Sequence, residues 1–438
     1  MHRDIKGYKT IIKGALEFVL PLCTDIYNGK KAIPLTSQSK RKIVSENSKM
    51  TSDGLRVIAV CYRDDYTKTA INENNMVFIG LIGIEDPPRK EAKQSVELCK
   101  RAGIRPIMIT GDHAETALSV AKKIGIADDN SKVMTGDILE KISDNELALT
   151  INQYNVFARV TPSHKMKIVK ALKANGEIVA MTGDGVNDAP ALSAADIGCS
   201  MGITGTDVAK SASDMVLTDD NFATIVKAIE NGRNLYRNIQ RAIQFLLSGN
   251  TAGILAVLYA SFMALPVPFK AVHLLFINLL TDSLPAIALG VEPHSSDVMN
   301  EKPRPKNQSI LTKKVLTNIC VEGVVIGVMT MIAFYVGFMR NAEVASTMAF
   351  STLCLSRLVH GFNCKSDKPV WFTKKMWNNK SMIGAFFVGF VLLNAVLLVP
   401  ALQGIFAVAP LTIAELLTVY GLSLGTFVVV QILKMIRK

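Results

Sequence analysis

The stretch MTGDGVNDAP, Met181 to Pro190, decides the fold of this chain and directly follows the apolar run Ile178 to Ala180. Its side chains at Asp184, Asn187 and Asp188 offer the hard oxygen ligands that suit Mg²⁺. The glycines between them let the backbone turn sharply and approach a ligand closely. The stretch therefore predicts a loop that follows a strand and holds a magnesium ion against a phosphoryl group.

Two upstream segments have the same character. MITGD, residues 108–112, follows an apolar run and precedes a predicted helix over 114–124. ARVTPSHK, residues 158–165, ends in a lysine that opens the helical pattern MKIVKALK. Ligands of open α/β sheets collect at the carboxyl ends of the strands, so we expect Thr110, Lys165 and Asp184 to converge on one phosphate. A hydroxyl, a cation and a metal ion are supports that phosphoryl transfer needs.

The three segments resemble the phosphorylation domain of P-type cation-transporting ATPases, members of the haloacid dehalogenase-like group. Lys13-Gly14-Ala15 is similar to the KGA motif of that family's nucleotide domain, and DPPR, residues 86–89, is similar to its hinge motif. Five motifs in the family's order carry the resemblance. It implies a haloacid dehalogenase-like, Rossmann-type α/β cytoplasmic domain followed by an α-helical transmembrane bundle.

The resemblance also implies a role for each matched residue. Asp184 would ligate Mg²⁺. ATP would be bound by Lys13, by Arg56 in the stretch LRVIAVCYRD, and by Arg159. The catalytic set would be Thr110, Gly111, Asp112, Lys165, Asn187 and Asp188.

One motif of the family does not occur in the sequence. The family transfers the γ-phosphate of ATP to the aspartate of a DKTGT motif, which these 438 residues do not contain. On this expectation the chain begins inside the nucleotide-binding domain. The missing N-terminal part of the same pump would supply the aspartate, the actuator domain and four further spans.

Hydropathy predicts a molecule in two parts. Hydrophobic residues make up 49% of the chain, and beyond about residue 221 they gather in runs of about 20, enough for a helix to cross a bilayer. We expect the end of the nucleotide-binding domain at 1–80, the phosphorylation domain at 81–221, a stalk helix at 222–241 and the transmembrane domain at 242–438. Six spans are predicted, at about 242–264, 270–290, 315–339, 344–362, 381–400 and 412–433.

The charges of the connections predict the orientation. The segments 291–314 and 365–380 and the C-terminal tail are basic, whereas the other three connections carry almost no charge. This positive-inside pattern places the soluble domain and the C-terminus in the cytoplasm of a multi-pass protein, which we expect in the plasma membrane. The same residues account for much of the net charge of +12, and no aromatic-interleaved basic patch indicates nucleic-acid binding.

Polar residues inside the first two spans predict an ion site. A carboxylate within a span is costly unless it is paired or coordinating, which makes Asp282 a functional candidate. Asn278 lies four residues earlier on the same helix face, and Pro285 loosens the helix nearby. Asn250 is read equally well as a ligand or as a hydrogen-bonding contact between helices. Amide, hydroxyl and carboxylate oxygens fit calcium better than copper or zinc, with manganese as the main alternative.

The stretch FINLLTDSLPAIALGVEP resembles the sixth span of calcium pumps, which implies that Asn250, Asn278 and Asp282 bind the transported cation. Gly253 and Arg357 stand where calcium pumps with a second site have acidic ligands. We therefore expect one calcium per cycle, with Arg357 pairing with Asp282 as a counter-charge that favours proton counter-transport. An equally weighted alternative is that Arg357 extends to the membrane interface.

Three classes of function follow from these patterns. The first is an ATP-driven calcium pump completed by an upstream part. The second is a membrane-tethered phosphatase of the same hydrolase group, which the long helix and Asp282 argue against. The third is a truncated, non-catalytic fragment.

Overall fold

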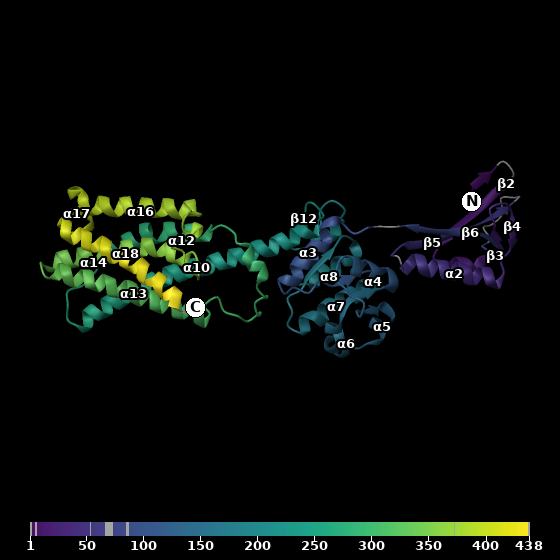
Figure 1. The fold of residues 1–438 in the computed structure, drawn as a ribbon, viewed down its shortest axis with the longest axis horizontal. Helices are drawn as coiled ribbons and strands as arrows, with labels where there is room; N and C mark the ends of the chain where they lie inside the picture. The colour runs from purple at the N-terminus through teal and green to yellow at the C-terminus, as the bar shows by residue number, and fades with distance from the viewer. Residues whose placement is uncertain are drawn as a thin grey trace. The chain divides into compact units, whose positions relative to one another are not determined.

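The computed structural model describes residues 2–4, 7–52, 54–65, 73–84, 87–371 and 373–436, and Asp86 of the expected hinge motif lies outside them. The chain divides into two compact units (Figure 1). The first comprises Met1–Ala228 and Met299–Lys306. The second comprises Ile229–Val298 and Asn307–Lys438.

A six-stranded sheet forms the N-terminal part of the first unit. The helix α2 (Ser37–Ser52) packs on it, and α1 (Leu16–Val19) adds to the same apolar core. The expected domain boundary between residues 80 and 81 falls inside β6 (Met76–Ile84), which pairs with β5 (Arg56–Asp65) along most of its length and with β3 (Cys23–Tyr27) at its start, so a boundary after β6 fits the sheet better. The strand order is β1 (His2–Asp4), β2 (Gly7–Gly14), β5 (Arg56–Asp65), β6 (Met76–Ile84), β3 (Cys23–Tyr27) and β4 (Ala32–Pro34).

Two parallel three-stranded sheets follow, which confirms the predicted α/β fold. The helix α7 (Pro162–Ala174) joins them, because Ile168 packs into the core of one sheet and Val169 into that of the other. One sheet has the order β7 (Met108–Ile109), β9 (Tyr154–Ala158), β8 (Lys132–Thr135), and the other β10 (Ala180–Gly183), β11 (Ile197–Met201), β12 (Met215–Leu217). The remaining helices are α3 (Lys90–Arg101), α4 (Ala114–Lys123), α5 (Gly136–Lys141), α6 (Asp144–Thr150), α8 (Ala189–Ala194) and α9 (Asp207–Ser211).

The helix α10 runs without interruption from Phe222 to Phe262, a length of 41 residues. The prediction that one helix continues from the stalk segment into the first span is therefore confirmed. A rod of this length transmits displacement because each turn is hydrogen-bonded to the next.

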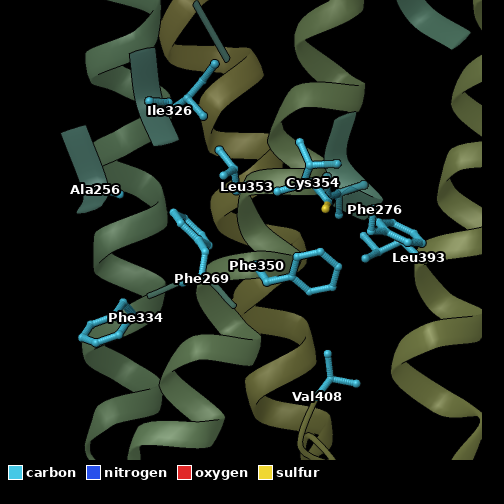
Figure 2. Close-up of a cluster of buried hydrophobic side chains, with 14 of the residues drawn as sticks. Ala256, Phe269, Phe276, Ile326, Phe334, Phe350, Leu353, Cys354, Leu393 and Val408 are labelled. Atoms are coloured by element: carbon cyan, nitrogen blue, oxygen red, sulfur yellow. The ribbon is translucent and has the colours of Figure 1, made fainter. Parts of the chain in front are cut away.

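The second unit is a helical bundle in which five segments are long and apolar enough to cross a membrane. They agree with five of the six predicted spans. Phenylalanine and aliphatic side chains from these segments, from α14 (Ala342–Cys364) and from the adjoining loops fill the largest buried cluster of the described residues, shown in Figure 2. The helices of the second unit are α10, α11 (Ala271–Phe276), α12 (Ser283–Gly290), α13 (Lys313–Phe338), α14 (Ala342–Cys364), α15 (Lys374–Trp377), α16 (Lys380–Leu398), α17 (Pro400–Phe406) and α18 (Ile413–Ile436).

The fourth predicted span is the helix α14, which is long enough but more polar than the other five. Every residue from Val344 to Cys364 is buried. The helix packs against α13, α16 and α18. Because protein surrounds α14, its polar side chains can find partners within the bundle, which is how a polar helix can be accommodated there.

Asp220 fixes the chain just before α10 begins. Its carboxylate accepts hydrogen bonds from the backbone N–H groups of Gly202, Ile203 and Thr204 at 2.7 to 2.9 Å, and from the Thr204 hydroxyl at 2.8 Å. These hydrogen bonds to the charged form, led by that from Ile203, lower the pKa of Asp220 to about 2. Its φ of 49° lies in the left-handed region, which aspartate and asparagine tolerate.

We expect Asp220→Asn to lower the melting temperature of the purified chain at pH 7, because an amide is a weaker acceptor than a carboxylate. The folded pKa of about 2 lies below the value of about 3.9 for an unfolded aspartate. The stabilisation is thus present above pH 5 and is lost as the pH falls towards 2. The difference in melting temperature between wild type and variant should narrow as the pH falls over that range. Asp129, which forms an exposed ion pair with Lys122, provides the control: Asp129→Asn should change the melting temperature little at any of these pH values. A difference in melting temperature that does not depend on pH contradicts the conclusion that the charged form of Asp220 stabilises the fold.

Candidate functional site

The loop after β10 is organised around Asp188. Its Oδ1 accepts a hydrogen bond from the Lys165 ammonium at 2.5 Å, and its Oδ2 lies 3.3 Å from the backbone nitrogen of Asp184. Gly183 is required for this arrangement, because a Cβ at that position would lie 2.4 Å from the Cβ of Asp188. The structure thus ties Lys165 and the backbone of Asp184 to Asp188, and the convergence of Thr110, Lys165 and Asp184 on one phosphate stays a prediction.

The burial of these residues separates two kinds of position. Asp188 is buried, whereas Asp184 and Asn187 are exposed at the surface of the loop. A buried carboxylate that already holds a lysine and a backbone N–H fixes the shape of the loop. Exposed carboxylate and amide oxygens fit a hydrated Mg²⁺, which keeps several of its waters.

The MITGD loop after β7 is tied to the loop after β9. The Thr110 hydroxyl donates to Asp112 Oδ2 at 3.0 Å, and the backbone carbonyl of Asp112 accepts from the Arg159 N–H at 2.9 Å. The N–H of Val160 donates to the Thr110 carbonyl at 3.2 Å. Gly111 and Asp112 are exposed, and their catalytic roles stay predictions.

Arg159 has partners that the sequence did not indicate. Its guanidinium donates to Glu17 Oε1 at 3.2 Å and lies 2.9 Å from His113 Nε2. Its φ of 51° is unusual for a residue with a side chain. Glu17 follows the KGA motif and His113 follows MITGD, but only the folded chain shows that the two meet at Arg159.

Lys13 and Arg56 lie on neighbouring strands of the six-stranded sheet. Lys13 of β2 is paired with Val60 of β5, four residues after Arg56. Alternation along a strand therefore puts both basic side chains on the same face, where both residues are exposed. Such a pair suits the phosphates of a nucleotide, and this assignment stays a prediction.

Each of the two parallel sheets has an edge strand beside one of the two loops with the sequences MITGD and MTGDGVNDAP. Among the residues that the structure describes, β7 pairs only with β9, and β10 pairs only with β11. MITGD begins with the two residues of β7, and MTGDGVNDAP begins with the last three residues of β10, so the unpaired edges lie next to Thr110 and Asp184. An extended segment from elsewhere can hydrogen-bond to such edges.

A buried ion pair forms the centre of the second unit. Arg357 Nη2 of α14 lies 2.6 Å from Asp282 Oδ2 and donates to Asn250 Oδ1 of α10 at 3.0 Å. Arg357 is only 3% exposed, so the alternative in which it extends to a membrane interface is wrong. The pairing of Arg357 with Asp282 is as predicted, and its role as a counter-charge stays a prediction.

The three predicted cation ligands line one pocket of about 410 Å³, together with Ser283. Asp282 Oδ1 is buried and has no hydrogen-bond partner among the described residues. Asn278 and Asp282 belong to a π-helical segment, Ile277–Asp282, that separates α11 from α12. Segments of this kind often occur at functional sites.

Two glycines on α10 have opposite surroundings. A Cβ on Gly249 would lie 2.2 Å from Arg357 Nε, so the absence of a side chain there makes room for the guanidinium. A Cβ on Gly253, one turn further, would have its closest neighbour at 4.0 Å. Gly253 stands where a ligand is expected from the sequence, whereas the room that Gly249 leaves for Arg357 has no signal in the sequence.

Comparisons with known proteins agree with both units. Residues 1–91 match the family model "P-type ATPase, cytoplasmic domain N", and residues 266–436 match "Cation transporting ATPase, C-terminus". The whole chain aligns at 44% identity with calcium-transporting ATPase 1 of Bacillus cereus, covering 52% of that protein.

Further relatives share this pattern. The calcium-transporting ATPase of Bacillus subtilis is 43% identical over 96% of the chain, and the rat calcium-transporting ATPase type 2C member 2 is 36% identical over 98%. These alignments cover 48% and 45% of the two proteins, so the chain spans about half the length of the relatives it matches. The haloacid dehalogenase-like sheets and the apolar helices agree with these matches. The chain therefore belongs to the family of P-type cation-transporting ATPases, which are integral membrane proteins.

Proposed function

We propose that this chain is the phosphoryl-stabilising and C-terminal membrane part of an ATP-driven calcium pump. The observation that carries the proposal is Asp282, whose Oδ1 is buried without a partner in a pocket shared with Asn250 and Asn278. A buried acceptor of this kind is costly unless a ligand satisfies it. The relatives named as calcium-transporting ATPases support calcium as that ligand.

The soluble unit has the groups needed to stabilise a phosphoryl group. The Thr110 hydroxyl and the Lys165 ammonium would contact its oxygens, and Asp184 and Asn187 would hold Mg²⁺, which neutralises the developing charge. Lys13, Arg56 and Arg159 would bind the ATP phosphates. Arg159 would have to leave Glu17 to do so, and their exposed contact is weak enough to be exchanged.

The aspartate that accepts the phosphoryl group would come from the N-terminal part of the same pump. A strand that carries it fits the unpaired edges of β7 and β10, because strands of neighbouring parallel sheets can be joined through a shared partner. Its carboxyl end would then lie beside Thr110 and Asp184. Binding of this strand would complete the sheet and the reaction centre together.

The bundle would bind one calcium per cycle. Arg357 is paired with Asp282 and bonded to Asn250, so its fixed charge lies beside these ligands and leaves no place for a second divalent ion. Gly253 adds no ligand. When calcium binds, the guanidinium would give up part of its contact with Asp282, and when calcium leaves, either the guanidinium or a proton would neutralise the carboxylate. If a proton neutralises it, the cycle carries that proton back across the membrane. The soluble unit would lie in the cytoplasm and the bundle in the plasma membrane.

The direct test uses the complete pump, with its upstream part, in lipid vesicles. We expect calcium to stimulate formation of the phosphoenzyme from labelled ATP, and Asp282→Asn to weaken that stimulation by more than tenfold, because a neutral amide replaces the charged ligand. The control Asp367→Asn changes a carboxylate that is 61% exposed and should behave as wild type. Stimulation by manganese without calcium would make manganese the substrate, and unchanged stimulation in Asp282→Asn would place the cation site elsewhere.

Substitution of the two glycines on α10 tests the place of Arg357. Gly249→Ala puts a methyl group 2.2 Å from Arg357 Nε, an overpacking that costs about 1–3 kcal/mol and displaces the guanidinium. We expect the apparent calcium affinity of the complete pump to change by about tenfold, on the scale of that energy. Gly253→Ala is the matched control, with the same change in helix propensity and no close atom, and should alter the affinity little. Equal effects of the two substitutions contradict this account.

The number of ions per cycle is a separate prediction. Simultaneous measurement of calcium uptake and ATP hydrolysis in tightly sealed vesicles should give a ratio of one. A ratio of two would show a second site, because the groups around Arg357 offer only one set of oxygen ligands.

A further inference from the structure

The bundle contains a second group of buried ligands that the calcium proposal does not use. Glu322 of α13 and His360 and Cys364 of α14 form it, and one ligand atom from each lies within 4.8 Å of the others. All three residues are buried, with at most 4% of their surface exposed. We call them the Glu–His–Cys cluster. It shares no residue with the pocket lined by Asn250, Asn278 and Asp282.

One nitrogen lies at the centre of the cluster. His360 Nε2 is 3.4 Å from Glu322 Oε2, 3.3 Å from Cys364 Sγ and 3.0 Å from Ser248 Oγ of α10. An imidazole nitrogen has a single in-plane direction in which it donates or accepts a hydrogen bond. It can therefore satisfy only one of these three neighbours at a time, whereas a cation between them would contact all of them.

The two spacings from His360 Nε2 fit a tetrahedral zinc ion, and Glu322 and Cys364 lie within 4.8 Å of each other. Zinc bonds of about 2.0–2.1 Å to nitrogen, 2.0–2.2 Å to oxygen and 2.3 Å to sulfur at tetrahedral angles separate the ligand atoms by about 3.3–3.6 Å. The distances from His360 Nε2 to Glu322 Oε2 and to Cys364 Sγ, 3.4 and 3.3 Å, are of that size. Ser248 Oγ, or a water molecule in its place, would occupy the fourth position.

The charges and the ligand types point to the same ion. A thiolate and a carboxylate together neutralise a divalent cation, which suits a buried site where net charge is costly. Thiolate and imidazole select zinc over calcium or magnesium. We propose that the Glu–His–Cys cluster is a zinc(II) site that links α13 to α14. Binding forms the zinc–sulfur bond and releases the thiol proton of Cys364 to solvent.

Neighbouring amides hold Glu322 and Asn363 in place, but they present a donor rather than an acceptor to His360 Nδ1. Gln244 of α10 donates to Glu322 Oε2 at 2.8 Å, and the Asn363 amide lies 3.5 Å from His360 Nδ1. Gln431 of α18 in turn donates to Asn363 Oδ1 at 2.6 Å. When Nε2 binds zinc, the ring proton resides on Nδ1 and needs an acceptor there. Asn363 presents its NH₂ group to Nδ1, so this contact opposes zinc binding, and Asn363→Asp would supply the missing acceptor.

The test is metal titration of the whole purified chain after treatment with a chelator. Calorimetry in buffers of different ionisation enthalpy should give one zinc bound and one proton released per chain, and zinc should raise the melting temperature. Cobalt(II) as a probe should show a thiolate-to-metal absorption band, which reports Cys364 without any mutation. Absence of zinc binding, or a cobalt complex without that band, overturns the proposal.

Variants locate the site. Cys364→Ser and His360→Gln should weaken zinc binding at least tenfold, whereas Cys354→Ser, the same change at a buried position of the same helix, should leave it unchanged. Asn363→Asp should bind zinc more tightly than wild type. Asp282→Asn should bind zinc as wild type does, so failure of the calcium assignment and failure of the zinc site give different results. Equal binding by Cys364→Ser and Cys354→Ser overturns the assignment.

Discussion

The buried ion pair between Asp282 and Arg357 is the interaction on which the bundle depends. Two charges removed from water carry a desolvation cost of several kcal/mol each, and their attraction repays it only with good geometry. The 2.6 Å contact and the hydrogen bond to Asn250 repay part of that cost, but Asp282 Oδ1 and Arg357 Nε have no hydrogen-bond partner among the described residues. Removal of either charge leaves the other unpaired, typically at a cost of about 3–5 kcal/mol. Because an apolar pair would often be at least as stable, we infer that the charges are retained for ion binding.

The neighbouring elements are arranged around this pair. The helix α14 is buried along nearly its whole length and therefore keeps Arg357 away from solvent. Gly249 leaves room for the guanidinium on α10, and the π-helical segment Ile277–Asp282 interrupts the regular hydrogen bonding next to the carboxylate. Since α10 also carries Asn250 and continues as one helix from Phe222, a displacement along its axis would change the ligand geometry. One long helix, α10, thus contributes a ligand next to the Asp282–Arg357 ion pair, in which we propose that calcium partly replaces the guanidinium.

Much of the fold and of the candidate site could be predicted from local sequence. The phosphoryl loops, the unbroken helix from Phe222 and the partnership of Asp282 with Arg357 each have a signal in a short motif or in hydropathy. The meeting of Glu17 with Arg159 has no such signal, because the two residues are 142 positions apart. In the Glu–His–Cys cluster, His360 and Cys364 are four residues apart on one helix, but Glu322 lies 38 positions before His360 and has no local signal. The predicted span at 344–362 coincides with α14, although this helix is more polar than the other five because other helices enclose it. The strand order of the N-terminal sheet likewise depends on long-range pairing.

The most direct test of the ion-pair account is an experimental structure of the complete pump with calcium bound. The account predicts one calcium ion within about 2.3–2.6 Å of an oxygen of Asp282, with Asn250 and Asn278 completing the site and the Arg357 guanidinium still in the bundle beside it. A calcium ion bound without Asp282, or two ions in this region with Arg357 turned out of the bundle, would contradict it.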